Sequence, residues 1–252
     1  MKPKNILQTS FIHLICILFL SIPGCQTIRN TYKARQQMLK GKNVNISKPD
    51  IKKTDSDMSH KQSIVVSKAH ELIGKKINES VIVKNRQFKL DCIGTVQAVY
   101  YAAGLDISKD FRKYKGNGVS RTYYSLKSNN GLYDDSIPGI GDIIFWDNTW
   151  DKNKDKVFGN DPLTHAGLVV NVEEDGTIHY IHASYSKGVC VAYMNLLNPD
   201  IYKNIQGKVL NSPLYIASST RNPPGHDWLS GQLWKKFGGV LKLSDYYQKS
   251  SR

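Results

Sequence analysis

The sequence predicts an α+β fold, in which helices precede an antiparallel sheet. Two segments with apolar residues at helical spacing come first, in residues 63–74 and 92–103. From residue 142 onward, short segments rich in β-branched and aromatic residues follow one another, separated by turn residues. Helices followed by a run of adjacent strands are typical of α+β domains.

Each predicted helix is bounded by residues that favour its ends. The segment 63–74 ends at Gly74, and the segment 92–103 follows Asp91, a good N-cap residue, and ends before Gly104. Residues 122–127 indicate a further helix, and residues 81–90 indicate a short extended piece between the first two helices.

Four strands are expected, and their pairing bears on two histidines. If Val172 lies opposite Thr177 across the turn 173–176, then His182 lies opposite Gly167 and shares a face with His165. A register shifted by one residue would place His179 there instead, and both remain open at this point. The expected strands are 142–146, 166–172, 177–183 and 188–194.

The chain beyond the last of these strands is interpreted as a C-terminal extension, residues 195–252, that packs on the domain. Its apolar residues recur at a spacing that we interpret as a helix against the body of the protein. These residues are Trp228, Leu229, Leu233, Trp234 and Phe237.

The first 24 residues have the pattern of a secretory signal. Lys2 and Lys4 precede an apolar segment, residues 11–22, which is too short to span a bilayer. The Gly24-Cys25 pair that follows resembles the bacterial lipoprotein signal, which implies cleavage before Cys25 and acylation of that residue. By the same analogy, Gln26 implies anchoring to an outer membrane, facing the periplasm. An ordinary secretory peptide or a retained anchor is the alternative.

Composition and charge exclude several classes of protein. Hydrophobic residues make up 40% of the 252 residues, which is enough for a packed core, and a single long apolar run excludes a polytopic membrane protein. Most of the net charge of +14 comes from residues 26–90, so no nucleic-acid-binding face is expected on the folded body. We interpret 25–60 as a flexible tether and 61–194 as the main domain, and we expect a monomer.

Two cysteines, Cys92 and Cys190, would remain available after export, because Cys16 leaves with the signal and Cys25 is acylated. They could form a disulfide, or one of them could be a working thiol. Cys92 falls in the first turn of a predicted helix, where free N–H groups and the helix dipole favour a thiolate with a lowered pKa. A small buried core cysteine is the competing interpretation.

His165 and His182 lie on consecutive predicted strands and suit a thiol mechanism, with His165 as the base and His182 holding its tautomer. The order of motifs resembles the NlpC-type bacterial cell-wall cysteine peptidases over about residues 62–191. The motifs that carry this resemblance are Ala69-x-x-Leu72-x-Gly74, Asp91-Cys92-Ile93-Gly94, Gly141-Asp142-Ile143-Ile144-Phe145, His165-Ala166-Gly167 and Ile181-His182-Ala183-Ser184.

The resemblance implies a papain-like domain that cleaves the stem peptides of peptidoglycan, with Cys92 as nucleophile, His165 as base and His182 as the orienting residue. It implies no metal or organic cofactor. Ile93 stands where the family usually has Ser, and the family's upstream aromatic substrate motif is replaced by other residues. An amidase at the sugar–peptide junction and a non-catalytic wall-binding lipoprotein therefore stay open as alternatives.

An insertion at residues 147–161 is rich in acidic side chains. Asp151, Asn153 and Asp155 have the spacing of calcium ligands, but Lys156 and Pro162 stand where an EF-hand requires Gly and Glu. The spacing excludes an EF-hand. It leaves open whether the loop binds calcium in another way or is a solvated loop at the rim of the site.

Overall fold

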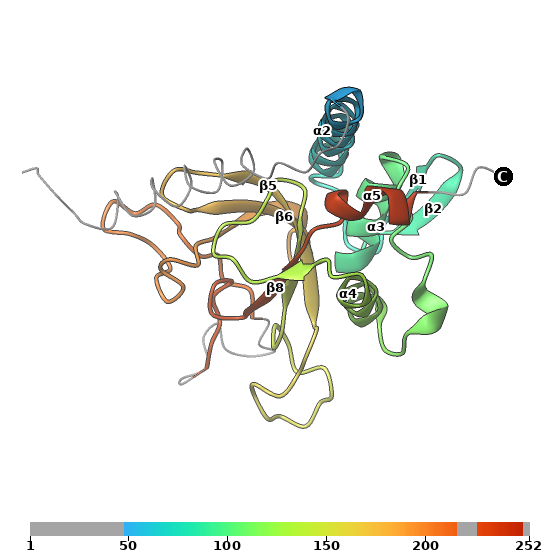
Figure 1. The fold of residues 1–252 in the computed structure, drawn as a ribbon. Helices are drawn as coiled ribbons and strands as arrows, with labels where there is room; N and C mark the ends of the chain where they lie inside the picture. The colour runs from blue at the N-terminus through green and yellow to red at the C-terminus, as the bar shows by residue number, and fades with distance from the viewer. Residues whose placement is uncertain (1–47, 216–225, 249–252) are drawn as a thin grey trace, which may run out of the picture. The chain divides into compact units, whose positions relative to one another are not determined.

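A six-stranded sheet, in the order β3-β8-β4-β5-β6-β7 with antiparallel neighbours, forms the centre of the fold in the computed structural model (Figure 1). The structure describes residues 48–215 and 226–248, which fall in the unit Asn45–Arg252. A separate two-stranded hairpin, β1-β2, precedes α3. The combination of helices with antiparallel sheets agrees with the α+β class that the sequence predicts.

The helical elements are α2 (Lys48–Glu71), α3 (Cys92–Ala102), η1 (Phe111–Lys113), α4 (Gly118–Ser128), η2 (Leu241–Leu243) and α5 (Ser244–Tyr247). The strands are β1 (Ser80–Val83), β2 (Arg86–Lys89), β3 (Leu132–Tyr133), β4 (Ile143–Trp146), β5 (His165–Val172), β6 (Ile178–Ser184), β7 (Gly188–Met194) and β8 (Trp234–Gly238).

Both faces of the central sheet are covered, because successive side chains on a strand point to opposite faces and both sets are apolar. On β4, Ile143 and Phe145 join a core that includes helices α2, α3 and α4. Ile144 and Trp146 instead join a second core, built with Leu214 and other residues of the C-terminal part. Figure 1 shows the helices gathered on one side of the sheet.

Helix α3 is held at its N-terminus by a cap and a close contact. Asp91 accepts a hydrogen bond from the backbone N–H of Gly94 at 2.7 Å, as its N-cap position predicts. A Cβ atom at Gly94 would lie 1.9 Å from the carbonyl oxygen of Lys89, so no larger residue fits without movement of the backbone. These contacts fix the position of Cys92, the first residue of the helix.

The register of β5 and β6 changes along the pair. Leu168 lies opposite Ile181, which is the register predicted from the turn, but Val172 lies opposite Ile178, one residue out of that register. A bulge at Val170 absorbs the difference. The predicted register is therefore found in the half of the pair next to the histidines, and the shifted register next to the turn.

The end of the apolar stripe that holds Trp234 and Phe237 forms a strand, and the rest of the stripe is not helical either, so the predicted helix is wrong. Residues Trp234–Gly238 form β8, which lies between β3 and β4 inside the sheet. Phe237, opposite Ile144, is fully buried in the second core. Pairing with both neighbours satisfies the backbone groups of β8, and this tertiary gain outweighs the helical spacing of its apolar residues.

Two further elements differ from the expected boundaries. Helix α2 begins at Lys48, inside the segment interpreted as a tether, and an ion pair between Asp57 and Lys61 one turn apart supports this polar part of it. The extended piece at 81–90 is a hairpin, because Lys84 and Asn85 take φ values of +45° and +66° and reverse the chain.

The predicted signal at residues 1–24 and the predicted acylation of Cys25 lie outside the described residues. Within residues 48–215 and 226–248, no helix has both the length and the apolar character needed to cross a membrane.

Candidate active site

The Cys92 sulfur lies among backbone N–H groups at the start of α3. The N–H groups of Ala166, Ile93 and Cys92 face the sulfur closely enough to lower the pKa of the thiol. The first two are N–H groups that the first turn of a helix leaves without intrahelical partners, and the third such group, of Gly94, is taken by Asp91. The sulfur therefore occupies a site built to stabilise negative charge.

Burial nevertheless dominates the titration of this thiol. Together with the nearby charge of Asp91, it raises the pKa of Cys92 from 9.0 to about 12, against the three backbone N–H groups, which lower that pKa. The expectation of a lowered pKa is therefore wrong for this state of the protein. The helix terminus does act in the expected direction, but the low dielectric around the sulfur outweighs it.

His165 and His182 are joined by a hydrogen bond. The Nε2 atom of His165 lies 2.8 Å from the Nδ1 atom of His182, and the two rings are nearly perpendicular. His165 is the first residue of β5 and keeps partial exposure, whereas His182, on β6, is only 6% exposed. Because Nε2 of His165 is committed to His182, its Nδ1 is the nitrogen left to exchange a proton with another group.

Aromatic side chains fix the two imidazoles on one face of the sheet. Trp146 lies directly opposite His165 across β4 and β5, and their ring centroids are 5.6 Å apart. Tyr180 packs against both Trp146 and His182. The indole N–H of Trp146 donates to the carbonyl of Ser230 at 2.8 Å, so the C-terminal part of the chain supports the site.

Burial keeps both imidazoles neutral near pH 7. It lowers the pKa of His165 from 6.5 to about 4, and it lowers the pKa of His182 well below the usual value. Repulsion from His165 and from Lys187 adds to the effect at His182. Two adjacent imidazoles cannot both be charged at low cost in this environment, so both rings rest neutral, and each is a weaker base than a solvated imidazole.

The side chains of Cys92 and His165 both lie near the start of β5, but on opposite faces of the sheet. Ala166, whose N–H faces the Cys92 sulfur, belongs to the core on the helix side, while His165 packs with Trp146 on the other face. Only the carbonyl carbon separates this N–H from Cα of His165, so the sulfur lies close to the start of β5, on the helix side of the sheet. In the part of the chain that the structure describes, no hydrogen bond joins the Cys92 sulfur to the His165 ring, which is bonded to His182 on the opposite face of the sheet. Proton transfer between the two side chains therefore requires the ring to turn toward the helix side.

The structure separates the two histidines that sequence pairing left open. His182 contacts His165, whereas His179 lies opposite Tyr193 and hydrogen-bonds to Glu173 near the β5–β6 turn. Cys190 lies opposite His182 on β7, with its sulfur 3.7 Å from the Nε2 atom of His182.

Cys92 and Cys190 are both free thiols, so the alternative of a disulfide between them is not what the structure contains. Cys190 is a neighbour of the imidazoles that the sequence motifs did not indicate. A three-residue turn at 185–187 between the last two predicted strands would have placed it opposite His182.

The acidic insertion at 147–161 uses its carboxylates to shape its own backbone. Asp155 accepts hydrogen bonds from the N–H of Val157 and the side chain of Asn160, and Asp151 accepts one from the N–H of Lys156. Within residues 48–215 and 226–248, no group of three or more His, Cys, Asp or Glu side chains is arranged to hold a metal ion. The described part of the chain thus offers no support for a calcium site.

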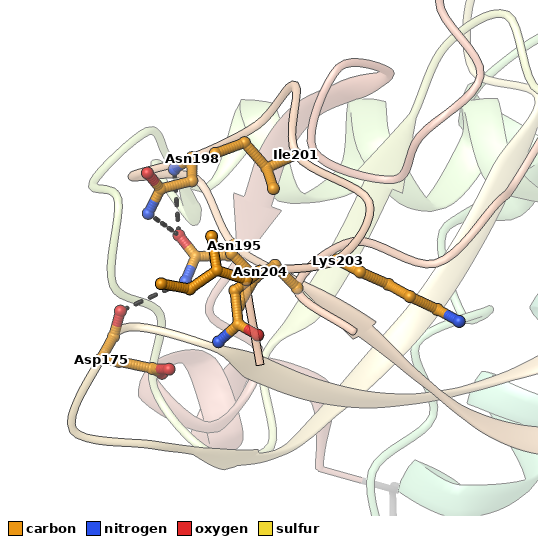
Figure 2. Close-up of a pocket in the computed structure, with 8 residues that line it drawn as sticks. Asp175, Asn195, Asn198, Ile201, Lys203 and Asn204 are labelled. Carbon is orange, nitrogen blue, oxygen red and sulfur yellow. Dashed lines mark hydrogen bonds between the residues drawn. The ribbon is translucent and has the colours of Figure 1, made fainter. Parts of the chain in front are cut away.

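A pocket lined by both polar and apolar side chains lies at the other end of the β5–β6 pair (Figure 2). There Asn195 donates to the carbonyl of Asp175 in the β5–β6 turn and accepts from the N–H of Asn198. His165 stands seven residues before Val172, the last residue of β5, which corresponds to about 23 Å along a strand. The amides of this pocket tie two loops together, and the pocket is distinct from the thiol and imidazoles.

No known family model matches the chain, and comparisons with curated proteins and with solved structures also found no match.

Proposed function

We propose that the protein is an exported cysteine hydrolase that cleaves amide bonds of peptidoglycan, with a papain-like domain similar to the NlpC-type peptidases. One observation carries the proposal. The Cys92 sulfur lies at the backbone N–H that follows His165, and the Nε2 atom of His165 is bonded to His182. A thiol, an imidazole base and a group that orients the base are the components of nucleophilic catalysis by cysteine.

In the proposed reaction, the Cys92 sulfur attacks the carbonyl carbon of the scissile amide while its proton passes to Nδ1 of His165. Backbone N–H groups of Cys92 and Ile93 stabilise the oxyanion that forms. His165 then gives this proton to the leaving amine, and the carbon–nitrogen bond breaks to leave a thioester. Water, deprotonated by His165, attacks the thioester and releases the carboxylic acid, and the proton returns to the sulfur.

The charge state of the site determines how the first step proceeds. Since burial disfavours both the thiolate and the imidazolium, the resting site holds a neutral thiol and a neutral imidazole. We infer that proton transfer accompanies the attack on the carbonyl and does not precede it. The acceptor nitrogen must then be unprotonated in the resting enzyme, which makes the tautomer of His165 decisive.

Stem peptides of the cell wall are the substrate that we propose, on the basis of the sequence motifs and the export signal. Acylation at Cys25 would hold the domain on the outer membrane, facing the periplasm. Trp150, 38% exposed, donates through its indole N–H to the carbonyl of Thr164, the residue before His165. It offers an aromatic surface beside the proposed catalytic residues.

A non-catalytic wall-binding lipoprotein is the second candidate, and the raised pKa of the Cys92 thiol is the observation that favours it. A thiol that stays protonated is a weak nucleophile unless a base acts on it. In this case the chain would bind peptidoglycan and leave its bonds intact.

Digestion of purified peptidoglycan by the full chain, followed by mass spectrometry of the released fragments, tests the proposal. We expect wild type and the control variant His179→Ala to release fragments with cleaved stem peptides, and Cys92→Ala to release none. Intact stems separated from sugars would instead indicate an amidase. Equal products from wild type and Cys92→Ala would overturn the proposal, and binding without cleavage by wild type would support the second candidate.

A further inference from the structure

The His165–His182 hydrogen bond continues into a third side chain. Cys190 lies directly opposite His182 on the neighbouring strand β7, and its sulfur is 3.7 Å from the Nε2 atom of His182. The side chains of His165, His182 and Cys190 thus form a continuous chain of hydrogen-bonding atoms across three adjacent strands, β5, β6 and β7.

Each link in this chain determines where the next proton lies. For Nδ1 of His165 to accept a proton, the neutral ring must carry its own proton on Nε2 and donate it to His182. Nδ1 of His182 must then be unprotonated, so the proton of that ring is on its Nε2 atom. This N–H group is directed at the Cys190 sulfur.

The surroundings of Cys190 favour hydrogen bonds that run in this order, from His165 through His182 to the Cys190 sulfur. Burial raises the pKa of the Cys190 thiol, while the charge of Lys187 and the backbone N–H of Ser184 lower it, so both of these groups present positive charge to the sulfur. His182 is 6% exposed, which leaves little room for water to replace the sulfur as its partner. A buried N–H without an acceptor is costly, so the sulfur stabilises the proton on Nε2 of His182.

We propose that Cys190 is a positioning residue, whose sulfur accepts the Nε2 proton of His182 and thereby holds both histidines in the tautomers that leave Nδ1 of His165 free. The inference rests on the proposed function, since the free Nδ1 atom matters only if His165 is a base. If Cys190 donated its S–H proton instead, the chain would run in reverse and place a proton on Nδ1 of His165.

Nitrogen-15 NMR of the histidine rings in the full-length protein tests the tautomers without any substrate. Near pH 7 we expect the signals of protonated Nε2 and unprotonated Nδ1 for both His165 and His182. A proton on Nδ1 of either ring in wild type would overturn the inference, and this result needs no variant.

Two variants of similar size test the role of the sulfur. Cys190→Ser keeps an acceptor, whereas Cys190→Val fills the space without one. We expect Cys190→Val to give mixed tautomers and to lower kcat about tenfold with little change in KM, because one hydrogen bond to the orienting histidine is lost. Cys190→Ser should keep the wild-type tautomers and most of the activity.

The two readouts separate failure of this inference from failure of the proposed function. Unchanged tautomers and unchanged kcat in Cys190→Val would overturn the role of Cys190 while the hydrolase proposal stands. If wild type shows the expected tautomers but hydrolyses no wall amide, the hydrogen bonds among His165, His182 and Cys190 are supported and the proposal of a hydrolase is overturned.

Discussion

The Nε2 atom of His165 and the Nδ1 atom of His182 lie 2.8 Å apart. This contact joins the first residue of β5 to a buried residue of β6, beyond the point where the backbones of the two strands are paired. Only one of the two nitrogens can carry the shared proton, so the contact ties the protonation of one ring to that of the other.

Removal of the acceptor on His182 should lower turnover. In His182→Leu the Nε2–H group of His165 loses its partner, and we expect kcat to fall about 100-fold with KM nearly unchanged. His182→Asn, which offers an amide oxygen, should recover part of the loss. Steady-state kinetics on a defined stem peptide measures both effects.

The matched control for His182 is His179→Ala on the same strand. His179 bonds to Glu173 near the turn, away from His165, so this variant should keep wild-type kcat. Equal losses in the His179 and His182 variants would contradict the assignment of His182 as the orienting residue.

The pH dependence of kcat/KM should reflect a buried base. Since burial lowers the pKa of His165 to about 4, the ring stays neutral and active above that pH, and activity should be lost only as the pH falls through it. We expect a flat profile between pH 6 and pH 8, because the Cys92 thiol with its raised pKa does not ionise there. A profile with an acid limb near pH 6.5 would indicate a solvated imidazole instead.

The lowered pKa of His165 also makes the free energy of unfolding depend on pH. A histidine whose pKa is lower in the folded state than in the unfolded chain stabilises the fold fully above about pH 6.5, and this contribution is lost as the pH falls through about 4. For His165 the loss amounts to at most about 3 kcal/mol. Urea unfolding at pH 7 and pH 4 measures it, and His165→Gln should show a smaller difference between the two pH values. An equal difference in both proteins would contradict burial of a neutral ring.

Much of the site's framework could be predicted from local sequence. Asp91 before an apolar helical segment indicated the start of α3, and the turn at 173–176 indicated the hairpin that brings His165 and His182 together. Both features depend on interactions between residues close in the chain, and short-range patterns report such interactions well.

Features that depend on distant parts of the chain could not be predicted in this way. The strand β8 forms because its neighbours β3 and β4, about 90 to 100 residues earlier, offer free edges on both sides. The bulge at Val170 and the pKa of Cys92 likewise depend on packing around them, and no local motif encodes either one. The sequence predicted that Cys92 lies at a helix terminus, which lowers the pKa of the thiol. It did not predict the burial of the sulfur, which raises that pKa by more.

The carboxylate of Asp91 has two effects that substitution can separate. Asp91→Ala removes the N-cap of α3 and should lower the free energy of unfolding by about 1 kcal/mol, measured by urea denaturation. Asp91→Asn keeps a capping oxygen and should retain most of that stability. Because the charge of Asp91 raises the pKa of Cys92, Asp91→Asn should also lower the pH at which the thiol ionises. Equal destabilisation by Ala and Asn would contradict the capping role.

The rate of alkylation of Cys92 by iodoacetamide at pH 7, followed by peptide mass mapping, tests most directly whether His165 acts on the thiol. With a thiol pKa of about 12, modification at this pH depends on a base that accepts the proton. We predict that His165→Ala lowers the rate at Cys92 about tenfold or more, while His179→Ala leaves it unchanged. Equal rates at Cys92 in wild type and His165→Ala would contradict the pairing of the two residues on which the hydrolase proposal depends.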